Sequence, residues 1–366
     1  MDKHLPYQDF DEEERPTTER IRRANADRNR KKEIRHRERQ VLKEFENEAR
    51  NLITGRVLRA EGAHFVVETE NHEEVRARSV KSTVSGNSNA TLVAVGDQVK
   101  IEQQDTDVAV IREVLERRTK LSRRAHKRRD SFEQVIAANV DLVLIVQCAV
   151  EPPFRTGLID RYILAAQEGN LQVAIILNKA DLLEEEERLE FIVEALKYYS
   201  SIGYPHFVTS VVDGEGIDEL LEAIGDKTVV LAGKSGVGKS SLMNAMLGEE
   251  IARTQGLMKK AQKGMHTTTT VSMIGLPDHH GYIVDTPGIK EFFHFEIDPD
   301  QLRFQFVDFA PFQEHCQMTG CLHMHEDGCA VSKAVDEEII PEWRYNSYVA
   351  FWEEAERERK ARIGGI

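Results

Sequence analysis

The chain has 366 residues, a formal net charge of −14, 40% hydrophobic residues and four cysteines. This length predicts two or three domains, and the acidic balance argues against a uniformly basic nucleic-acid-binding protein. No apolar run approaches the ~18 residues of a membrane helix, the opening residues lack a signal-peptide core, and so few cysteines argue against a disulfide framework. We therefore expect a cytoplasmic protein with no membrane partner.

Residues 1–50 are polar and carry no periodic apolar stripe, so we expect a charged, mobile arm or a helix that only a partner orders. Within this arm, residues 20–39 contain ten Lys and Arg against three acidic residues. A second basic segment, residues 117–129, contains eight Lys and Arg and no acidic residue. Either segment alone fits a solvated helix face or linker. The two together favour a polyanionic partner, whose binding would weaken steeply with salt.

Residues 51–118 contain five short β-prone runs separated by Gly, Asn and Asp turn signals. Five strands in so short a segment predict a small barrel, and the OB-fold is the commonest five-stranded form. Such barrels often bind nucleic acid, although a fold does not by itself establish function. The expected strands are residues 53–60, 64–70, 73–80, 98–104 and 108–114.

The pattern changes to α/β over residues 119–295. Apolar runs typical of buried strands alternate there with helical stretches, which predicts a mostly parallel sheet with helices on both faces. The expected fold class is thus multidomain α/β. The expected strands are residues 140–146, 173–177, 206–210, 228–232, 271–276 and 282–286, and the expected helices are residues 158–168, 185–199, 217–224 and 239–247.

A phosphate-binding loop (P-loop) follows the fourth of these strands. GKSGVGKS, residues 233–240, matches G-x-x-x-x-G-K-[ST] between a strand and a helix, the context in which this motif binds a nucleoside triphosphate. The glycines let backbone N–H groups surround the β-phosphate, Lys239 bridges β- and γ-oxygens, and Ser240 takes a Mg²⁺ position. The expected nucleotide contacts are Gly233, Lys234, Ser235, Gly236, Val237, Gly238, Lys239, Ser240 and Ser241.

Two later segments fit the switch regions of such a site. VDTPG ends a strand with Asp285 and Gly288, a D-x-x-G pattern whose Asp holds Mg²⁺ through water and whose Gly N–H can sense a γ-phosphate. Between the P-loop and this motif lies GMHTTTT, where a threonine is expected to contact Mg²⁺ and the γ-phosphate. The candidates are Thr267, Thr268 and Thr269, although the run also fits the start of a strand.

The tetrapeptide NKAD, residues 178–181, indicates guanine recognition. A carboxylate at its last position can accept from guanine N1–H and the exocyclic NH2 together, a donor pair that adenine lacks. The first two residues brace the neighbouring loop, and a second loop can offer a backbone amide to guanine O6. The expected base contacts are Asn178, Lys179, Asp181, Ser210 and Val211.

The base-recognition motifs precede the P-loop, whereas GTPases usually have the reverse order. Either NKAD is an accident of sequence or the domain has been rearranged. A circular permutation keeps every loop at the carboxyl end of its strand, so the site survives while the chain termini move. We therefore predict a circularly permuted P-loop GTPase domain.

Residues 296–366 are expected to be helical except for a cluster of Cys and His. Three thiolates and one imidazole suit a closed tetrahedral Zn²⁺ site, which has no open position for catalysis. Bound zinc could contribute on the order of 10 kcal/mol to folding so small a module. The expected ligands are Cys316, Cys321, His323 and Cys329, with His315 and His325 as rivals, whereas Cys148 fits a core strand.

At this point the sequence resembles a known family, the ribosome small subunit-dependent GTPase A family (RsgA or YjeQ). The resemblance covers about residues 50–355. In order, it includes the barrel, QVIAANVDLVLIV, NKAD, GKSGVGKSSLMNAML, GMHTTTT, DTPGIKEF, the Cys/His cluster and RYNSY at residues 344–348. It implies an N-terminal OB-fold β-barrel, a circularly permuted GTPase domain and a C-terminal helical zinc-binding domain.

In that family the three domains act on the 30S ribosomal subunit late in its maturation, and the subunit stimulates GTP hydrolysis. The resemblance therefore implies 16S rRNA as a partner, Mg²⁺ with GTP, one structural Zn²⁺ and a GDP product, and we expect a monomer. The long arm has no role assigned by the resemblance. We expect its basic stretch to reach rRNA.

The resemblance also bears on catalysis. Ile289 follows Gly288, where many GTPases have a Gln that orients water, so another group must position the attacking water. The family points to His266, with Lys239 as the second catalytic candidate, although His266 also fits an ordinary loop histidine. Ordered switches supplied in trans can raise GTPase rates by about 10³ to 10⁵.

Three alternatives stay open on the sequence. The protein could be an RNA-binding assembly factor that binds GTP with little turnover, which Ile289 keeps in view. It could be a permuted GTPase of the large ribosomal subunit. An ATP-dependent kinase or ATPase is the third, and Asp181 argues against it.

Overall fold

The computed structural model describes residues 52–85, 91–103, 107–124, 133–183, 186–248, 271–278, 281–285, 297–324 and 326–363. The arm of residues 1–50, His266, Thr267 to Thr269, Gly288, Ile289 and His325 lie outside these residues. What we expect of them therefore stays a prediction. None of the described helices is both long and apolar enough to cross a membrane.

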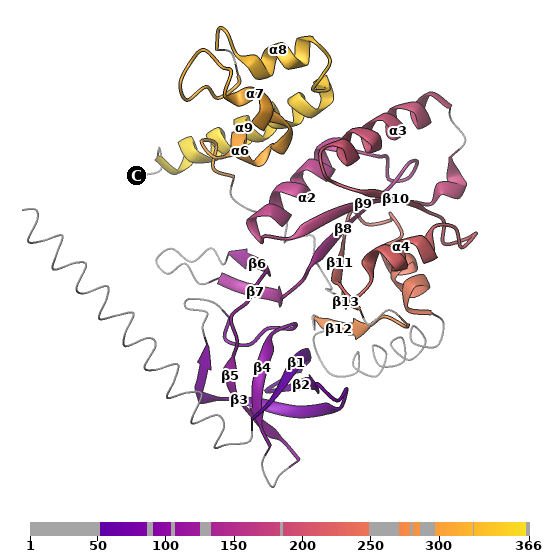
Figure 1. Ribbon diagram of the computed structural model, residues 1–366, viewed down its shortest axis with the longest axis vertical. Coiled ribbons are helices and arrows are strands. Elements are labelled where there is room, and N and C mark those ends of the chain that lie inside the picture. Colours follow the sequence, from indigo (N-terminus) through magenta and orange to yellow (C-terminus); the bar gives the residue numbers. More distant parts are fainter. Residues whose placement is uncertain are drawn as a thin grey trace, which may run out of the picture. The chain divides into compact units, whose positions relative to one another are not determined.

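The first five strands form a closed β-barrel (Figure 1). Strand β1 pairs with β2 and with β4, β2 pairs with β3, and β3 runs parallel to β5, which pairs with β4. In β4, QVKIE alternates buried Val99 and Ile101 with half-buried polar residues, so one face packs inward. The expected OB-type barrel is confirmed. Its strands are β1 (Leu52–Glu61), β2 (His64–Thr69), β3 (Glu74–Ser85), β4 (Gln98–Glu102) and β5 (Ala109–Val114).

An antiparallel hairpin that the sequence did not predict follows the barrel in the chain, β6 (Lys120–Arg124) with β7 (Glu133–Ala138). Arg117, just before β6, has a buried side chain, and its guanidinium donates to both carboxylate oxygens of Asp97 at 2.7 and 2.8 Å. By contrast, Arg118 is exposed and lies 3.4 Å from Asp141. Arg117 therefore has a structural role and is not part of a free basic surface for a polyanion.

Within the described residues, the sheet of the α/β region has the strand order β10-β9-β8-β11-β13-β12. The first five run parallel, and β12 is antiparallel to β13. The expected mostly parallel sheet is therefore confirmed, with the phosphate strand β11 at its centre. The strands are β8 (Leu142–Cys148), β9 (Gln172–Asn178), β10 (His206–Thr209), β11 (Thr228–Ala232), β12 (Ser272–Gly275) and β13 (Tyr282–Asp285).

Helices cover both faces of this sheet because its central strands are apolar on both sides. In β8, Val143 and Ile145 pack with α2 and α3, whereas Leu144 and Val146 pack with α4 and the helix over residues 239–248. Cys148 is fully buried in the second of these cores, as expected. The other helices here are α2 (Thr156–Glu168), the 3₁₀ turn η1 (Ala180–Leu182), α3 (Glu186–Ser201) and α4 (Ile217–Ile224).

The chain from residue 297 forms a small helical module, as predicted. Its core contains the fully buried rings of Phe306, Phe309 and Tyr348, with ring centroids 5.0 to 5.2 Å apart. The helices are short except for the last, so side-chain packing rather than helix length holds the module together. They are α6 (Leu302–Gln305), η3 (Val307–Phe309), α7 (Ala310–Gln313), α8 (Ala330–Asp336) and α9 (Glu342–Ile363).

The buried pair Arg117 and Asp97 provides a test of this fold. Arg117→Met should lower the free energy of unfolding by about 3 to 5 kcal/mol, because it leaves the Asp97 carboxylate buried without its cation. The neighbouring variant Arg118→Met should change stability by less than about 1 kcal/mol, because its ion pair is exposed. Urea unfolding of both variants measures this, and equal effects would contradict the assignment.

Candidate nucleotide site and metal centre

The predicted nucleotide-binding loops meet at one edge of the parallel sheet. Asn178 ends β9, Ser210 follows β10, Gly233 follows β11, and Asp285 ends β13. Because β8, β9, β10, β11 and β13 run parallel, these positions all lie at carboxyl ends, where open α/β sheets bind ligands. The order of the motifs in the sequence therefore does not disturb their meeting in space.

The P-loop backbone needs glycine at two close approaches. Gly233 has φ +143°, and a Cβ there would lie 2.3 Å from the carbonyl oxygen of Val146 in β8. Gly238 has φ +92°, and its Cβ would lie 2.4 Å from Asn178 Nδ2. Lys239 Nζ donates to the carbonyls of Gly233 and Lys234 at 2.7 Å each. The loop is thus folded tightly around the lysine ammonium.

Asn178, at the end of β9, connects the P-loop with the end of β10. Its Nδ2 donates to the carbonyl oxygen of Val237 in the P-loop at 2.9 Å, and its Oδ1 accepts from the hydroxyl of Thr209 at 3.0 Å. The side chain is buried, so both ends of the amide are satisfied away from water. The base-recognition strand is therefore joined directly to a phosphate loop 59 residues later in the chain.

Asp181 and Ser210 form the next contact in the same place. The hydroxyl of Ser210 lies 2.9 Å from Asp181 Oδ1 and 2.9 Å from Asp213 Oδ2, and it accepts from the N–H of Asp213 at 3.2 Å. Asp181 is exposed in the turn η1. Ser210 thus fixes one carboxylate oxygen of Asp181 while the side chain stays open to a ligand.

Lys179 adopts the left-handed conformation at φ +61° between the end of β9 and the turn η1. Its Nζ donates to the carbonyl oxygen of Glu151 at 3.2 Å. The loop of residues 149–155 follows β8 and also approaches the P-loop, since a Cβ on Gly236 would lie 3.5 Å from Pro152 Cδ. This loop therefore borders both the base-recognition and the phosphate motifs.

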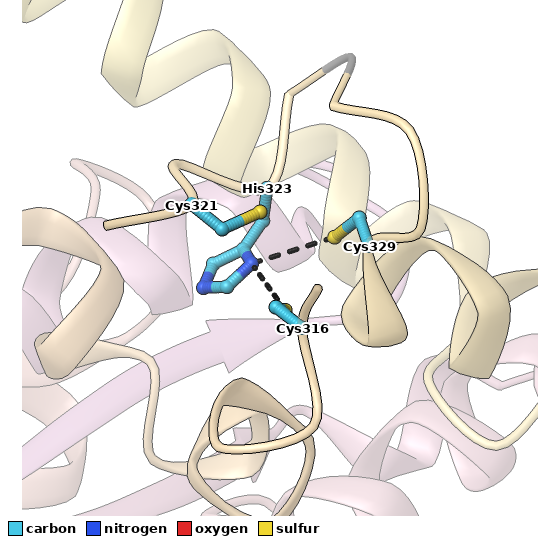
Figure 2. Close-up of side chains that lie close together, drawn as sticks. All are labelled: Cys316, Cys321, His323 and Cys329. Atoms are coloured by element: carbon cyan, nitrogen blue, oxygen red, sulfur yellow. Dashed lines mark hydrogen bonds between the residues drawn. The ribbon is translucent and has the colours of Figure 1, made fainter. Parts of the chain in front are cut away.

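The four predicted zinc ligands also come together. One ligand atom from each of Cys316, Cys321, His323 and Cys329 lies within 4.8 Å of all the others. His323 Nδ1 lies 3.6 Å from Cys316 Sγ and 3.4 Å from Cys329 Sγ (Figure 2). Zn–S and Zn–N bonds of ~2.3 and ~2.0 Å would place sulfur and nitrogen about 3.5 Å apart in a tetrahedron. The donor set therefore fits a structural Zn²⁺, with His323 rather than the exposed His315 in the cluster.

The surroundings of the cluster support metal binding. The N–H groups of Ala330 and Ser332 donate to Cys316 Sγ and Cys329 Sγ at 3.4 Å, and Glu326 accepts from the N–H groups on either side of His323, at Leu322 and Met324. Burial raises the pKa of the Cys321 thiol to about 12 and lowers the pKa of His323. Burial alone therefore favours the protonated thiol, whereas a bound divalent cation favours the thiolate, because a coordinating thiol is deprotonated outright.

Several residues at these sites were not predicted. Thr209, Glu151 and Asp213 hold Asn178, Lys179 and Ser210 in place. Thr209 and Asp213 lie within four residues of the predicted Ser210, so proximity to a motif is the signal that points to them. Glu151 contributes a backbone carbonyl, for which a sequence carries no signal.

The fold and the loops at the carboxyl ends of the sheet define a class of protein. It has a P-loop nucleotide-binding domain in which the base-recognition strands precede the phosphate strand in the sequence. A family model described as RsgA GTPase matches residues 114–295. The Small ribosomal subunit biogenesis GTPase RsgA of Chlorobaculum parvum is 42% identical over 81% of this chain and 96% of its own. The protein of that name from Bacteroides fragilis is 34% identical over 82% of this chain and 97% of its own.

Two solved structures agree with these relatives. The crystal structure of YjeQ from Thermotoga maritima matches with a TM-score of 0.69 and 31% identity, covering 83% of this chain and 98% of that chain. The structure of YloQ, a circularly permuted GTPase, matches with a TM-score of 0.67 and 26% identity, covering 84% of this chain and 96% of that chain. The chain therefore belongs to the RsgA GTPase family and is a GTP hydrolase with a permuted domain.

The metal centre yields a direct test. The full chain should carry one zinc, and His323→Ala should lose it and unfold the C-terminal module more easily, because a fourth tetrahedral ligand is gone. His315→Ala should keep its zinc, since that exposed side chain lies outside the cluster. Elemental analysis of both purified variants checks this. Zinc retained by His323→Ala and lost by His315→Ala would contradict the ligand set.

Proposed function

We propose that the loops at the carboxyl ends of the parallel strands bind GTP, and that hydrolysis of this GTP serves the maturation of the small ribosomal subunit. The observation that carries the proposal is the hydrogen-bonded chain from Thr209 through Asn178 to Val237, which joins the base and phosphate motifs. Without that connection, NKAD and the P-loop would be two unrelated sequence matches. With it, both can act on one nucleotide.

The proposed roles follow from chemistry and position. Asp181 accepts from guanine N1–H and the exocyclic NH2, with its carboxylate oriented by Ser210. Lys239 exchanges its bonds to the loop carbonyls for the β- and γ-phosphates, which it neutralises. Ser240 and Asp285 would hold Mg²⁺, which supplies further neutralisation of phosphate charge. The remaining proposed contacts are Lys179, Val211, Ser241, Thr267, Thr268, Thr269, Gly288 and the P-loop backbone of Gly233, Lys234, Ser235, Gly236, Val237 and Gly238.

Water attacks the γ-phosphate in line, so the protein forms no covalent intermediate. It speeds hydrolysis by positioning the reactants and by supplying charge. With Ile289 after Gly288, we assign the orientation of that water to His266. The proposed role of the 30S subunit is to bring this residue to the attacking water, so hydrolysis would be slow without the subunit.

The relatives support the proposed partner. The proteins of Chlorobaculum parvum and Bacteroides fragilis carry small ribosomal subunit biogenesis in their names, and the present chain spans at least 96% of each. We infer that this protein binds the 30S subunit and its 16S rRNA as a monomer in the cytoplasm. The Cys/His cluster would hold one structural zinc, which contributes folding energy and no catalytic step.

One other function has a specific observation in its favour. Ile289 replaces the usual water-orienting Gln, which suits an assembly factor that binds GTP with little turnover. Such a factor would bind GTP and the small subunit tightly and turn GTP over only slowly.

Hydrolysis of GTP and of ATP, measured with no subunit, with purified 30S and with purified 50S subunits, tests the proposal. We expect slow GTP hydrolysis alone, a rise toward about 10³-fold with 30S only, and little ATP hydrolysis. Lys239→Ala should abolish the stimulated rate while the variant stays folded, because the phosphate charge is no longer neutralised. Stimulation by 50S instead of 30S would overturn the assigned partner, and tight 30S binding without turnover would favour the binding factor.

A further inference from the structure

The RYNSY segment, residues 344–348, is part of the family resemblance but has no role in the site described above. It lies in the first turns of α9 and contacts two different regions. Arg344 meets the α/β region, and Tyr345 and Tyr348 meet the loop of the metal centre. One helical segment thus touches both parts at once.

On the α/β side, Arg344 is 1% exposed and lies between two buried carboxylates. Nη1 donates to Asp160 of α2 at 2.5 Å. Nε and Nη2 donate to Asp308 of η3, within the helical module itself, at 3.0 and 2.8 Å. Its guanidinium also lies 4.1 Å from the ring of Phe306. Burial acts to lower the pKa of Arg344, but the two carboxylates raise it above its ordinary value, so the group stays charged.

On the metal side, the tyrosine hydroxyls bind the backbone around His323. Tyr345 donates to the carbonyl of His323 at 2.7 Å, and Tyr348 donates to the carbonyl of Leu322 at 2.5 Å. These carbonyls belong to the loop that carries the imidazole ligand. The position of α9 is therefore tied to the shape of the metal loop.

From Asp160 the contacts continue to the nucleotide site. The hydroxyl of Tyr199 lies 2.5 Å from Asp160 Oδ1 and 3.1 Å from the carbonyl of Thr156, the first residue of α2. The loop of residues 149–155 ends where α2 begins, and it contacts Lys179 and borders the P-loop. Displacing the start of α2 would thus displace a wall of the site.

We propose that Arg344 is a positioning residue that couples the metal centre to guanine-nucleotide affinity. The loop around His323 fixes the position of α9 through Tyr345 and Tyr348. In turn, α9 fixes the position of the start of α2 through Arg344 and Asp160. This rests on the proposed nucleotide site. Because binding equilibria are reciprocal, zinc strengthens GDP binding by the same factor by which GDP strengthens zinc binding, a factor of about 5 to 150 for ordinary allosteric coupling.

The test is a thermodynamic cycle on the full chain. The Kd for GDP is measured by calorimetry with zinc bound and after zinc is removed by a chelator. The zinc Kd is then measured by chelator competition with and without GDP. For the unmodified protein we expect GDP binding to weaken at least about fivefold on zinc removal, with a matching effect of GDP on zinc.

Arg344→Lys keeps the charge but loses the fork that spans two carboxylates, so its GDP affinity should no longer depend on zinc. Glu354→Gln is the matched control, since Glu354 also joins α9 to α2, through Arg161, but lies outside the buried network. That variant should keep the full coupling. If Arg344→Lys does not fold, the double variant Tyr345→Phe and Tyr348→Phe, which removes only two hydroxyls, decides the question.

The outcomes are distinct. No GDP binding by the unmodified protein would defeat the proposed function itself. GDP binding that is unchanged within twofold on zinc removal would overturn the coupling. Full coupling in a folded Arg344→Lys, or in the tyrosine double variant if that is the one that folds, would overturn the role of this segment.

Discussion

The buried amide of Asn178 is the contact on which the arrangement of the site depends. It accepts from Thr209, the last residue of β10, and donates to the carbonyl of Val237 in the P-loop that follows β11, so the ends of β9 and β10 and the P-loop are held at hydrogen-bond distance. Leaving a buried amide group without its partner costs about 1 to 3 kcal/mol. Gly238 permits this approach because it has no Cβ to meet the Asn178 side chain. The base and phosphate loops are therefore fixed relative to each other.

The scrambled order of the motifs is compatible with this contact because a parallel sheet collects its carboxyl-end loops at one edge. Permutation changes only which strands are connected. Its consequence lies downstream, since the chain after Asp285 continues into the helical module with the metal centre. That module returns through α9 to α2, where Arg344 and Asp160 form a buried ion pair. Metal loop and nucleotide edge are thus connected by packed residues as well as by sequence.

Local patterns made most of the fold predictable. The barrel strands, the parallel sheet with its helices and the zinc cluster are signalled by alternation, apolar runs and ligand spacing, all of which operate over a few residues. What sequence could not provide were pairings across long separations. Arg117 counted as part of a basic segment, yet its side chain is buried against Asp97. Arg344 entered only as part of the RYNSY segment, and nothing in the sequence pointed to its partners Asp160 and Asp308. From sequence alone, a charged side chain is expected to lie in solvent, because its distant ion-pair partner is not visible in the local pattern.

Base selectivity measures the central claim most directly, namely that Asp181 and the P-loop act on one guanine nucleotide. Asp181→Asn replaces a carboxylate acceptor with an amide that can donate to the O2 of xanthine. Calorimetric titration should show GTP binding weakened by at least about tenfold, the loss of a charged hydrogen bond, together with new binding of xanthosine triphosphate. Unchanged GTP affinity in the variant, or equal affinity of the unmodified protein for ATP and GTP, would contradict the account.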